Sequence, residues 1–292
     1  MDRTDFRLLA EIHKDALQST RSLARAAKIT PPAAHARLRK LEQQGILRGF
    51  AAYLDPSVFG KQECIVRFAG PHAREACLSA AREEDVVLVA HKVDGGVTAL
   101  VWLDERSDVV ERLTRLFDAK PSYQTRTPAR AVPELSPLDW RVLRACIDAP
   151  KHTTRELVEA SGLSARTAVK RRDALLASRV LSIKPNTGLL AGSGDVVYTM
   201  GLFGTIPFAS VRKLLGECMV LNTFEDPPSR YLLGRADDLA DAIARTEALR
   251  KAPGVVGVEL SLNRDLWFRP ETLRDAVDAK LAAWGRSPPG TG

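Results

Sequence analysis

The chain repeats its own residue pattern at an offset of 134 residues, and this repeat limits the folds that are open to it. From residue 2 to about residue 47, adding 134 carries the first segment onto the second without a gap. The matched pairs include Asp5 and Asp139, Leu9 and Leu143, Thr20 and Thr154, Ala34 and Ala168, Arg37 and Arg171, and Leu41 and Leu175. A chain of 292 residues has room for two or more domains with separate cores. The sequence therefore predicts two copies of one unit.

A capped basic helix is the most distinctive segment of each copy. In the first copy, segment 30–45 opens with Thr30, a good N-cap, followed by two prolines where missing N–H groups cost nothing, and it ends at Gly45. A shorter helix is expected at 21–28, and the short turn between the two is typical of a helix-turn-helix. Segment 46–54 is expected to form a short hairpin, the wing. A solvated helix pair without a ligand is the alternative interpretation.

The net charge of +7 is concentrated in the two predicted helix-turn-helix segments. Residues 1–60 hold 10 basic against 6 acidic residues, and residues 136–190 hold 10 against 5, whereas the other segments are close to neutral. Such segregation is typical of phosphate binding rather than of a solubilising surface.

Each helix-turn-helix segment is followed by a βαββαβ pattern. In the first copy, strands are predicted at 62–69, 86–93, 97–103 and 123–127, with helices at 73–82 and 107–117. In the second copy, strands are predicted at 196–203, 219–224, 231–234 and 255–262, with helices at 208–215 and 237–250. The order indicates a ferredoxin-like antiparallel sheet with two helices on one face. The predicted fold class is thus α+β, a tandem repeat of a winged helix-turn-helix followed by a ferredoxin-like domain.

The expected domain bounds follow from this order. They are 1–60 and 136–190 for the two winged helix-turn-helix domains, 61–130 for the first ferredoxin-like domain, and 195–285 for the second with its C-terminal helix. That last helix, 270–284, is expected to bury Leu273, Val277, Leu281 and Trp284 along one stripe, and the tail 287–292 to be disordered. Scattered cysteines, no metal-ligand spacing and no apolar run long enough for a membrane span favour a cytoplasmic protein without metal or cofactor.

Two sequence stretches carry a resemblance to a known family. LEQQGIL at 41–47 and GFAAYLDPSVFG at 49–60, with the winged helix-turn-helix and the ferredoxin-like pattern, resemble the Lrp/AsnC (feast/famine) transcriptional regulators. The second half resembles them in the order of its predicted elements more than in its residue identities. The resemblance implies sequence-specific binding to double-stranded DNA, self-association through the ferredoxin-like domains, often into eightfold rings, and an effector, an amino acid or similar small molecule, near the hairpin joining the second and third strands.

Candidate site residues come from the recognition helices and from those hairpins. The expected DNA-binding residues are Thr30, Pro32, His35, Arg37, Arg39 and Lys40 in the first copy, and Ser164, Arg166, Thr167, Lys170 and Arg171 in the second. The resemblance places an effector near His91, Gly95, Gly96, Thr98, Asp226, Ser229 and Arg230. The first hairpin lacks the acids that suit an amino group. Arg172 stands where Leu38 lies in the first copy, so its stem must extend outward or the helix must roll.

The functional hypothesis is a DNA-binding transcriptional regulator and not an enzyme. No catalytic motif occurs, and the five histidines are isolated from one another. Two alternatives remain open. One is a fused sirohaem-decarboxylase-like enzyme, since those enzymes resemble paired copies of this family and need basic residues around a polyanionic tetrapyrrole. The other is a ligand-sensing assembly module without DNA binding.

Overall fold

The computed structural model describes residues 1–128, 130–188 and 196–286, and two sets of three helices occupy the predicted helix-turn-helix segments. The first set is α1 (Arg3–Lys14), α2 (Thr20–Ala27) and α3 (Pro31–Gln43), and the second is α6 (Pro137–Asp148), α7 (Thr154–Ser161) and α8 (Ala165–Ala177). Capping boxes at Asp2 and Ser136 start α1 and α6. The predicted caps Thr30 and Ser164 start α3 and α8. These local predictions are confirmed.

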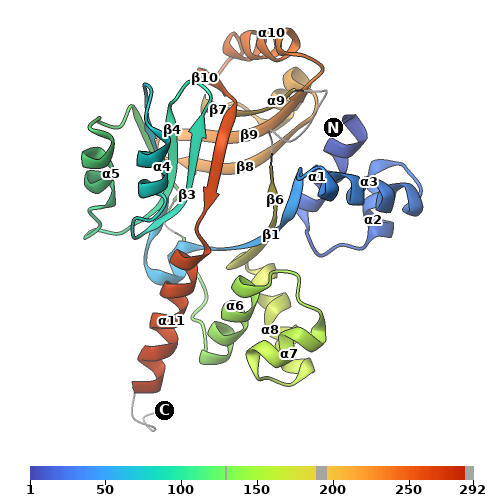
Figure 1. The fold of residues 1–292 in the computed structure, drawn as a ribbon, viewed down its shortest axis with the longest axis vertical. Helices are drawn as coiled ribbons and strands as arrows, with labels where there is room; N and C mark the ends of the chain where they lie inside the picture. Colours follow the sequence, from blue (N-terminus) through green and yellow to red (C-terminus); the bar gives the residue numbers. More distant parts are fainter. Residues whose placement is uncertain (129, 189–195, 287–292) are drawn as a thin grey trace.

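The predicted wing hairpin at 46–54 is wrong. Strand β1 (Leu47–Leu54) continues without a turn and pairs in antiparallel register with β6 (Leu181–Thr187) from the second half of the chain. Gly49, at φ 121°, lies where the register shifts, so it allows a bulge rather than a hairpin turn. The two strands form a ladder that joins the two halves, which we call the β1–β6 ladder (Figure 1).

The first larger sheet has five strands in the order β11-β3-β4-β2-β5, and we call it sheet 1. Its members are β2 (Gln62–Phe68), β3 (Val86–Lys92), β4 (Val97–Leu103), β5 (Tyr123–Arg126) and β11 (Asn263–Phe268). Helices α4 (Arg74–Ala80) and α5 (Val109–Phe117) pack on one face through Cys77, Leu113 and Phe117. A short 3₁₀ helix, η1 (Pro56–Phe59), precedes β2. Strand β11 was not predicted; it comes from the C-terminal segment and pairs with β3.

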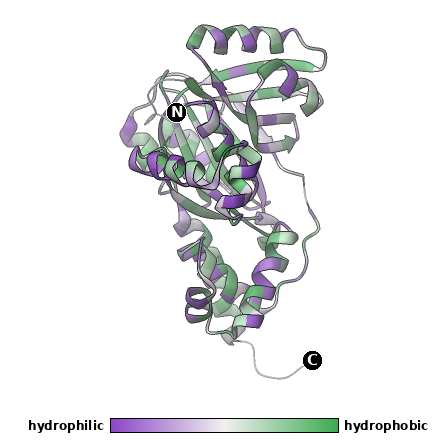
Figure 2. Ribbon diagram, turned by 90° about the vertical axis from the view of Figure 1, so that its right-hand side faces the viewer, coloured by the Kyte–Doolittle hydropathy of each residue, from purple (hydrophilic) through white to green (hydrophobic). Residues whose placement is uncertain are grey.

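The second larger sheet, sheet 2, has four strands in the order β10-β7-β9-β8. Its members are β7 (Val196–Gly204), β8 (Cys218–Glu225), β9 (Pro228–Ala236) and β10 (Val255–Ser261). Helices α9 (Phe208–Leu215) and α10 (Leu239–Arg250) cover one face and share its core with Tyr198, Met200 and Leu232. Both sheets have the strand order of a βαββαβ unit. Figure 2 shows hydrophobic residues, in green, on both the strands and the helices that cover them, with hydrophilic residues, in purple, between them.

The uncovered faces of the two sheets meet inside the chain. The Tyr123 and Phe203 rings lie 4.6 Å apart, Asn222 donates to Glu63 Oε1 at 2.8 Å, and the Arg126 amide donates to the Asp226 carbonyl at 2.9 Å. Each three-helix unit packs on the sheet of the opposite half. Phe6 and Leu9 of α1 share a core with Met219 and Leu233 of sheet 2.

The reciprocal contact joins the second three-helix unit to sheet 1. Trp140 of α6 lies 5.4 Å from Phe59, and Phe59 stacks 5.3 Å from Trp102 of β4. Because each unit rests on the other half's sheet, the two halves are interlocked rather than placed side by side.

The last helix, α11 (Pro270–Arg286), packs along α6. Leu273 and Val277 are fully buried there, and Arg144 of α6 pairs with Asp278 at 2.7 Å. Trp284 is 50% exposed, so its predicted burial is wrong. The tail 287–292 and the domain limits at 190 and 195 lie outside the described residues.

Candidate nucleic-acid interface and internal cavity

The outer face of α3 carries a histidine and two basic side chains. His35, Arg39 and Lys40 are exposed, and none of them takes part in an ion pair within the part of the chain that the structure describes. Ala34 and Leu41 on the opposite face are buried. Thr30 and Pro32 are exposed at the start of the helix, and the Thr30 hydroxyl accepts from the Ala33 amide. The helix can therefore present its N-terminus and basic face to an anionic partner.

Helix α8 presents a second, different basic face. Arg166 and Lys170 are exposed and free of ion pairs among the described residues, and the Thr167 hydroxyl lies 2.9 Å from that of Ser164. Arg172, whose side chain is 19% exposed, bonds the exposed Asp173 at 2.9 Å. Pairing with the neighbouring acid keeps the guanidinium out of the core, as the substitution at this position requires.

Arg37 and Arg171, both expected to contact DNA, instead fasten the recognition helices to the helices before them. Arg37 Nη1 lies 2.6 Å from Asp2 and 2.8 Å from Asp5. Arg171 Nη1 lies 2.8 Å from both Ser136 Oγ and Asp139. In each copy the arginine therefore completes the capping box of the first helix. The Nη1 atom of each arginine is thus bonded within the protein, and this bond holds the recognition helix on the helix before it.

The seven expected effector residues do not converge on one site. His91 is buried on β3, stacks 6.5 Å from Trp267 and lies 3.6 Å from Asp265 of β11. Gly95 and Gly96 form the turn between β3 and β4, in which the Gly96 amide donates to Asp94. Three of the remaining members have partners outside the cavity. Asp226 forms an isolated β-bridge with Arg126. The Ser229 hydroxyl donates a hydrogen bond to Thr125, and Arg230 donates one to the Ile206 carbonyl. Thr98 is the one member that lines the cavity described next.

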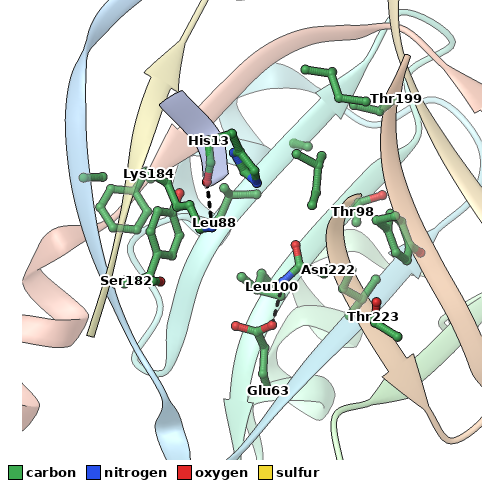
Figure 3. Close-up of a pocket in the computed structure, with 18 of the residues that line it drawn as sticks. His13, Glu63, Leu88, Thr98, Leu100, Ser182, Lys184, Thr199, Asn222 and Thr223 are labelled. Carbon is green, nitrogen blue, oxygen red and sulfur yellow. Dashed lines mark hydrogen bonds between the residues drawn. The ribbon is translucent and has the colours of Figure 1, made fainter. Parts of the chain in front are cut away.

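A cavity of about 590 Å³ lies between sheets 1 and 2 and is bordered by the β1–β6 ladder and the end of α1. Its volume falls within the range of roughly 300–1,000 Å³ for small-molecule sites. Apolar wall residues include Leu88, Leu100, Met219, Leu221, Leu266 and Phe268. Figure 3 shows three polar groups around this wall: His13 with Lys184, Glu63 with Asn222, and the hydroxyls of Thr98, Thr199 and Thr223.

Burial shifts the protonation equilibria of the cavity groups. It raises the pKa of Glu63 from 4.5 to about 7, against the hydrogen bond from Asn222, and lowers the pKa of His13 to about 4, assisted by the charge of Lys184. Burial also lowers the pKa of Lys184, and that of Lys92 to about 8. At neutral pH His13 is therefore uncharged, and Glu63 is close to its midpoint.

The sequence carried no local signal for this cavity. Its polar residues come from at least seven separate elements, and a lone lysine or glutamate on a strand is ordinarily an exposed residue. In the described ranges no three His, Cys, Asp or Glu side chains are grouped to hold a metal ion, and no helix there has the length and apolarity to cross a bilayer.

Comparison with known proteins identifies the first domain. Residues 1–48 match a family described as winged helix-turn-helix DNA-binding. Over 60 residues the chain is 37% identical to the HTH-type transcriptional regulator AldR of Mycolicibacterium smegmatis, covering 20% of this chain and 35% of AldR. Over 100 residues it is 30% identical to the leucine-responsive regulatory protein of Klebsiella pneumoniae, covering 32% of this chain and 61% of that protein. The chain thus spans about a third to three fifths of these relatives, and the matching segments belong to regulators with a helix-turn-helix.

Solved structures also align with the chain. The siroheme decarboxylase NirDL aligns over 97% of this chain and all of its own, at 12% identity and a TM-score of 0.48. The leucine response regulatory protein LrpA of Mycobacterium tuberculosis aligns over 47% of this chain and 98% of its own, at 19% identity and a TM-score of 0.32. The expectation that the chain is not an enzyme is corrected to this extent: a structure that aligns over nearly the whole chain is that of an enzyme.

Proposed function

We propose that the chain is a DNA-binding transcriptional regulator of the Lrp/AsnC type in which two copies of the regulator are fused. The copies would comprise winged domains at 1–60 and 136–190 and ferredoxin-like domains at 61–130 and 195–285. The observation that carries this proposal is the pair of exposed basic recognition helices, α3 and α8, held in one chain by the β1–β6 ladder. The match to regulators over the first domain supports it.

The register of the ladder supports a two-fold relation between the helices. Phe50 faces Pro185, and Ala51 faces Lys184. At the offset of 134 residues, Pro185 is the counterpart of Ala51, and Lys184 is the counterpart of Phe50. Exchanging the two halves therefore reproduces the same pairing, as at the axis of a symmetric dimer. A dimer of helix-turn-helix domains presents two recognition helices to successive major grooves in this way.

The two recognition helices would read different half-sites. In the first, His35, Arg39 and Lys40 are the proposed readers or phosphate contacts, with Thr30 and Pro32 near the backbone. In the second, Arg166, near the helix start, is positioned for a bidentate contact with guanine, and Thr167 and Lys170 follow it. A good bidentate contact contributes about 1–3 kcal/mol of base discrimination. The operator would therefore be an imperfect inverted repeat.

Site selection from a random DNA pool tests this proposal. Wild type should enrich an asymmetric inverted repeat, and Arg166→Ala should relax base preference in one half-site only. Lys251→Ala, which changes an exposed lysine outside both helices, is the matched control and should leave the motif unchanged. Enrichment of no motif, or an identical motif from the Arg166→Ala protein, would contradict the assignment.

Assembly and location in the cell are proposed on the same basis. The paired sheets make one chain equivalent to a dimer, so an eightfold ring of ferredoxin-like domains would need only four chains. Light scattering at micromolar concentration tests this, since a strict monomer excludes the ring. A regulator of DNA would act in the cytoplasm.

A second candidate function, decarboxylation of a tetrapyrrole, is favoured by the cavity alone. Asn222 and Thr223 line it, whereas His91 and Arg230 do not. A tetrapyrrole with several carboxylates needs several free cations, but Lys92 is paired with Glu259 and Arg130 with Asp55. A new absorbance band on adding a porphyrin to the purified protein would support this function, and an unchanged spectrum would exclude it.

A further inference from the structure

Lys184 brings a positive charge into the cavity without a carboxylate to balance it. Its Nζ donates to the His13 carbonyl at 3.0 Å, and within the described ranges it forms no ion pair. The charged group that acts on it is Arg179, another cation, at the rim of the cavity. A partly buried ammonium without a counter-charge is costly, so the site favours a partner that supplies a negative charge.

His13 adds a second unsatisfied group on the same side. Its Nε2 is buried and has no hydrogen-bond partner among the described residues. His13 and Lys184 lie together at one side of the cavity in Figure 3, while Leu88 and Leu100 form part of the apolar wall between them and the Glu63–Asn222 pair. One end of the cavity thus suits an acid group and its middle suits an apolar body.

Two further cations of the lining are already neutralised. Lys92 pairs with Glu259 at 2.5 Å and Arg130 with Asp55 at 3.1 Å. Arg179 is also unpaired among the described residues, but it is exposed at the rim of the cavity. Lys184 is therefore the unpaired cation that lies inside the rim, next to His13, which favours a ligand with a single acid group over a polyanion.

We propose that this cavity binds an organic anion with one acid group on an apolar body, and that the bound anion alters DNA affinity. The acid group would contact Lys184 and His13, and the apolar body would lie on Leu88 and Leu100. The regulatory part of the proposal rests on the proposed function; the binding site does not depend on it.

The structure provides a direct route from the cavity to the recognition helices. His13 is on α1, whose Asp5 is held by Arg37 of recognition helix α3. Lys184 is on β6, which follows recognition helix α8 and pairs with β1 of the first half. An anion bridging His13 and Lys184 would contact an element of each winged unit at once. Its binding energy would therefore favour one relative position of α3 and α8.

The site is tested with the fluorescent dye anilinonaphthalene sulfonate, which carries one sulfonate on an aromatic body. The native chain should bind one dye saturably, and Lys184→Met should weaken the dissociation constant at least tenfold. Thr98→Trp should fill the cavity and abolish binding although every charge remains. Lys251→Met, at an exposed surface lysine, should bind as wild type does. Near-ultraviolet circular dichroism checks that each variant keeps native packing.

Two results would overturn the site. One is unchanged dye affinity in both Lys184→Met and Thr98→Trp, and the other is an equal loss in Lys251→Met, which would place the dye on the surface.

A second titration separates the site from its regulatory role. DNA affinity is measured by fluorescence anisotropy with and without saturating dye. At least a threefold change in wild type, absent in Lys184→Met, would support coupling, and an unchanged DNA affinity would overturn it. A protein that binds the dye at Lys184 but no DNA would overturn the proposed function while leaving the anion site supported.

Discussion

The variant Glu63→Gln should be more stable than wild type above pH 7 and equally stable below pH 4.5. Glu63 lies on the cavity wall, where burial raises the pKa of its carboxyl from 4.5 to about 7. The unfolded chain releases this proton at a lower pH than the folded protein does. Stability therefore falls as the pH rises from about 4.5 to about 7 and then levels off.

The size of the effect follows from the two pKa values. Each pH unit between them corresponds to about 1.4 kcal/mol, so ionising Glu63 in the folded protein costs roughly 3 kcal/mol at pH 8. Glutamine cannot ionise, and its carbonyl still accepts the hydrogen bond from Asn222, which is 2.8 Å long in wild type. Since 1 kcal/mol corresponds to about 2–4 °C in a domain of this size class, the melting temperature should rise by roughly 6–12 °C at pH 8.

Thermal unfolding of wild type and variant from pH 4 to pH 8.5 measures this difference. His13 acts in the opposite direction, because its pKa is lowered to about 4 and its contribution is lost as the pH falls below about 6.5. Because both proteins contain His13, subtracting the stability of wild type from that of the variant at each pH removes the contribution of His13. Glu105→Gln, at an exposed turn, is the control and should show no pH-dependent gain. A Glu63→Gln protein that gains nothing between pH 5 and pH 8 would refute the buried-acid assignment.

Three further predictions follow from the packing of the helices and the burial of the thiols. Arg37→Ala should lower the free energy of unfolding by about 1–3 kcal/mol in urea, because it leaves a buried carboxylate unpaired, whereas Arg21→Ala, at an exposed position, should change it little. Leu273→Ala should cost about 2–5 kcal/mol and Trp284→Ala less than about 1 kcal/mol, since the first side chain is fully buried and the second half-exposed; equal losses would contradict the packing of α11. Burial raises the pKa of all four cysteine thiols to about 11, so Ellman's reagent at pH 8 should react only after unfolding, and rapid reaction of the native protein would show exposed thiolates.

The sequence predicted those parts of the fold that short-range chemistry determines. A hydroxyl or carboxylate N-cap with an acid three residues later, as in Ser136 and Asp139, starts a helix through contacts within one turn. Strand positions in both ferredoxin-like units were likewise predicted from alternating apolar residues. The start of α3 and the strands of the two βαββαβ units were therefore found from local pattern.

Long-range pairing was not predictable from the same patterns. Strand β11 is a short edge strand whose partner, β3, lies about 170 residues earlier, and β1 pairs with β6 instead of folding back on itself. The sequence of neither strand indicates a partner at that separation, because an edge strand has the same local residue pattern whether it is paired or not.

The exposed faces of the recognition helices were predicted from the sequence, whereas the contacts of Arg37 and the cavity were not. The exposed cations of α3 and α8 follow from helical periodicity, so Arg39 and Arg166 lie on the faces expected for them. Arg37 has the same local environment in sequence, yet its guanidinium reaches the cap of α1 from 32 residues away. The cavity depends on two sheets meeting face to face, so no single segment contained it.

The most direct test of the account is the DNA affinity of two matched double variants of the intact chain. One changes Arg39 and Lys40 to Ala on α3, and the other changes Arg166 and Lys170 to Ala on α8. Anisotropy titrations over a range of salt on a selected operator should show weaker binding by both variants. The salt dependence should also become shallower, by about 0.9 in log–log slope for each phosphate that the variant no longer neutralises. A variant of either helix that retains wild-type affinity and slope would contradict the claim that both helices of the fused chain bind DNA.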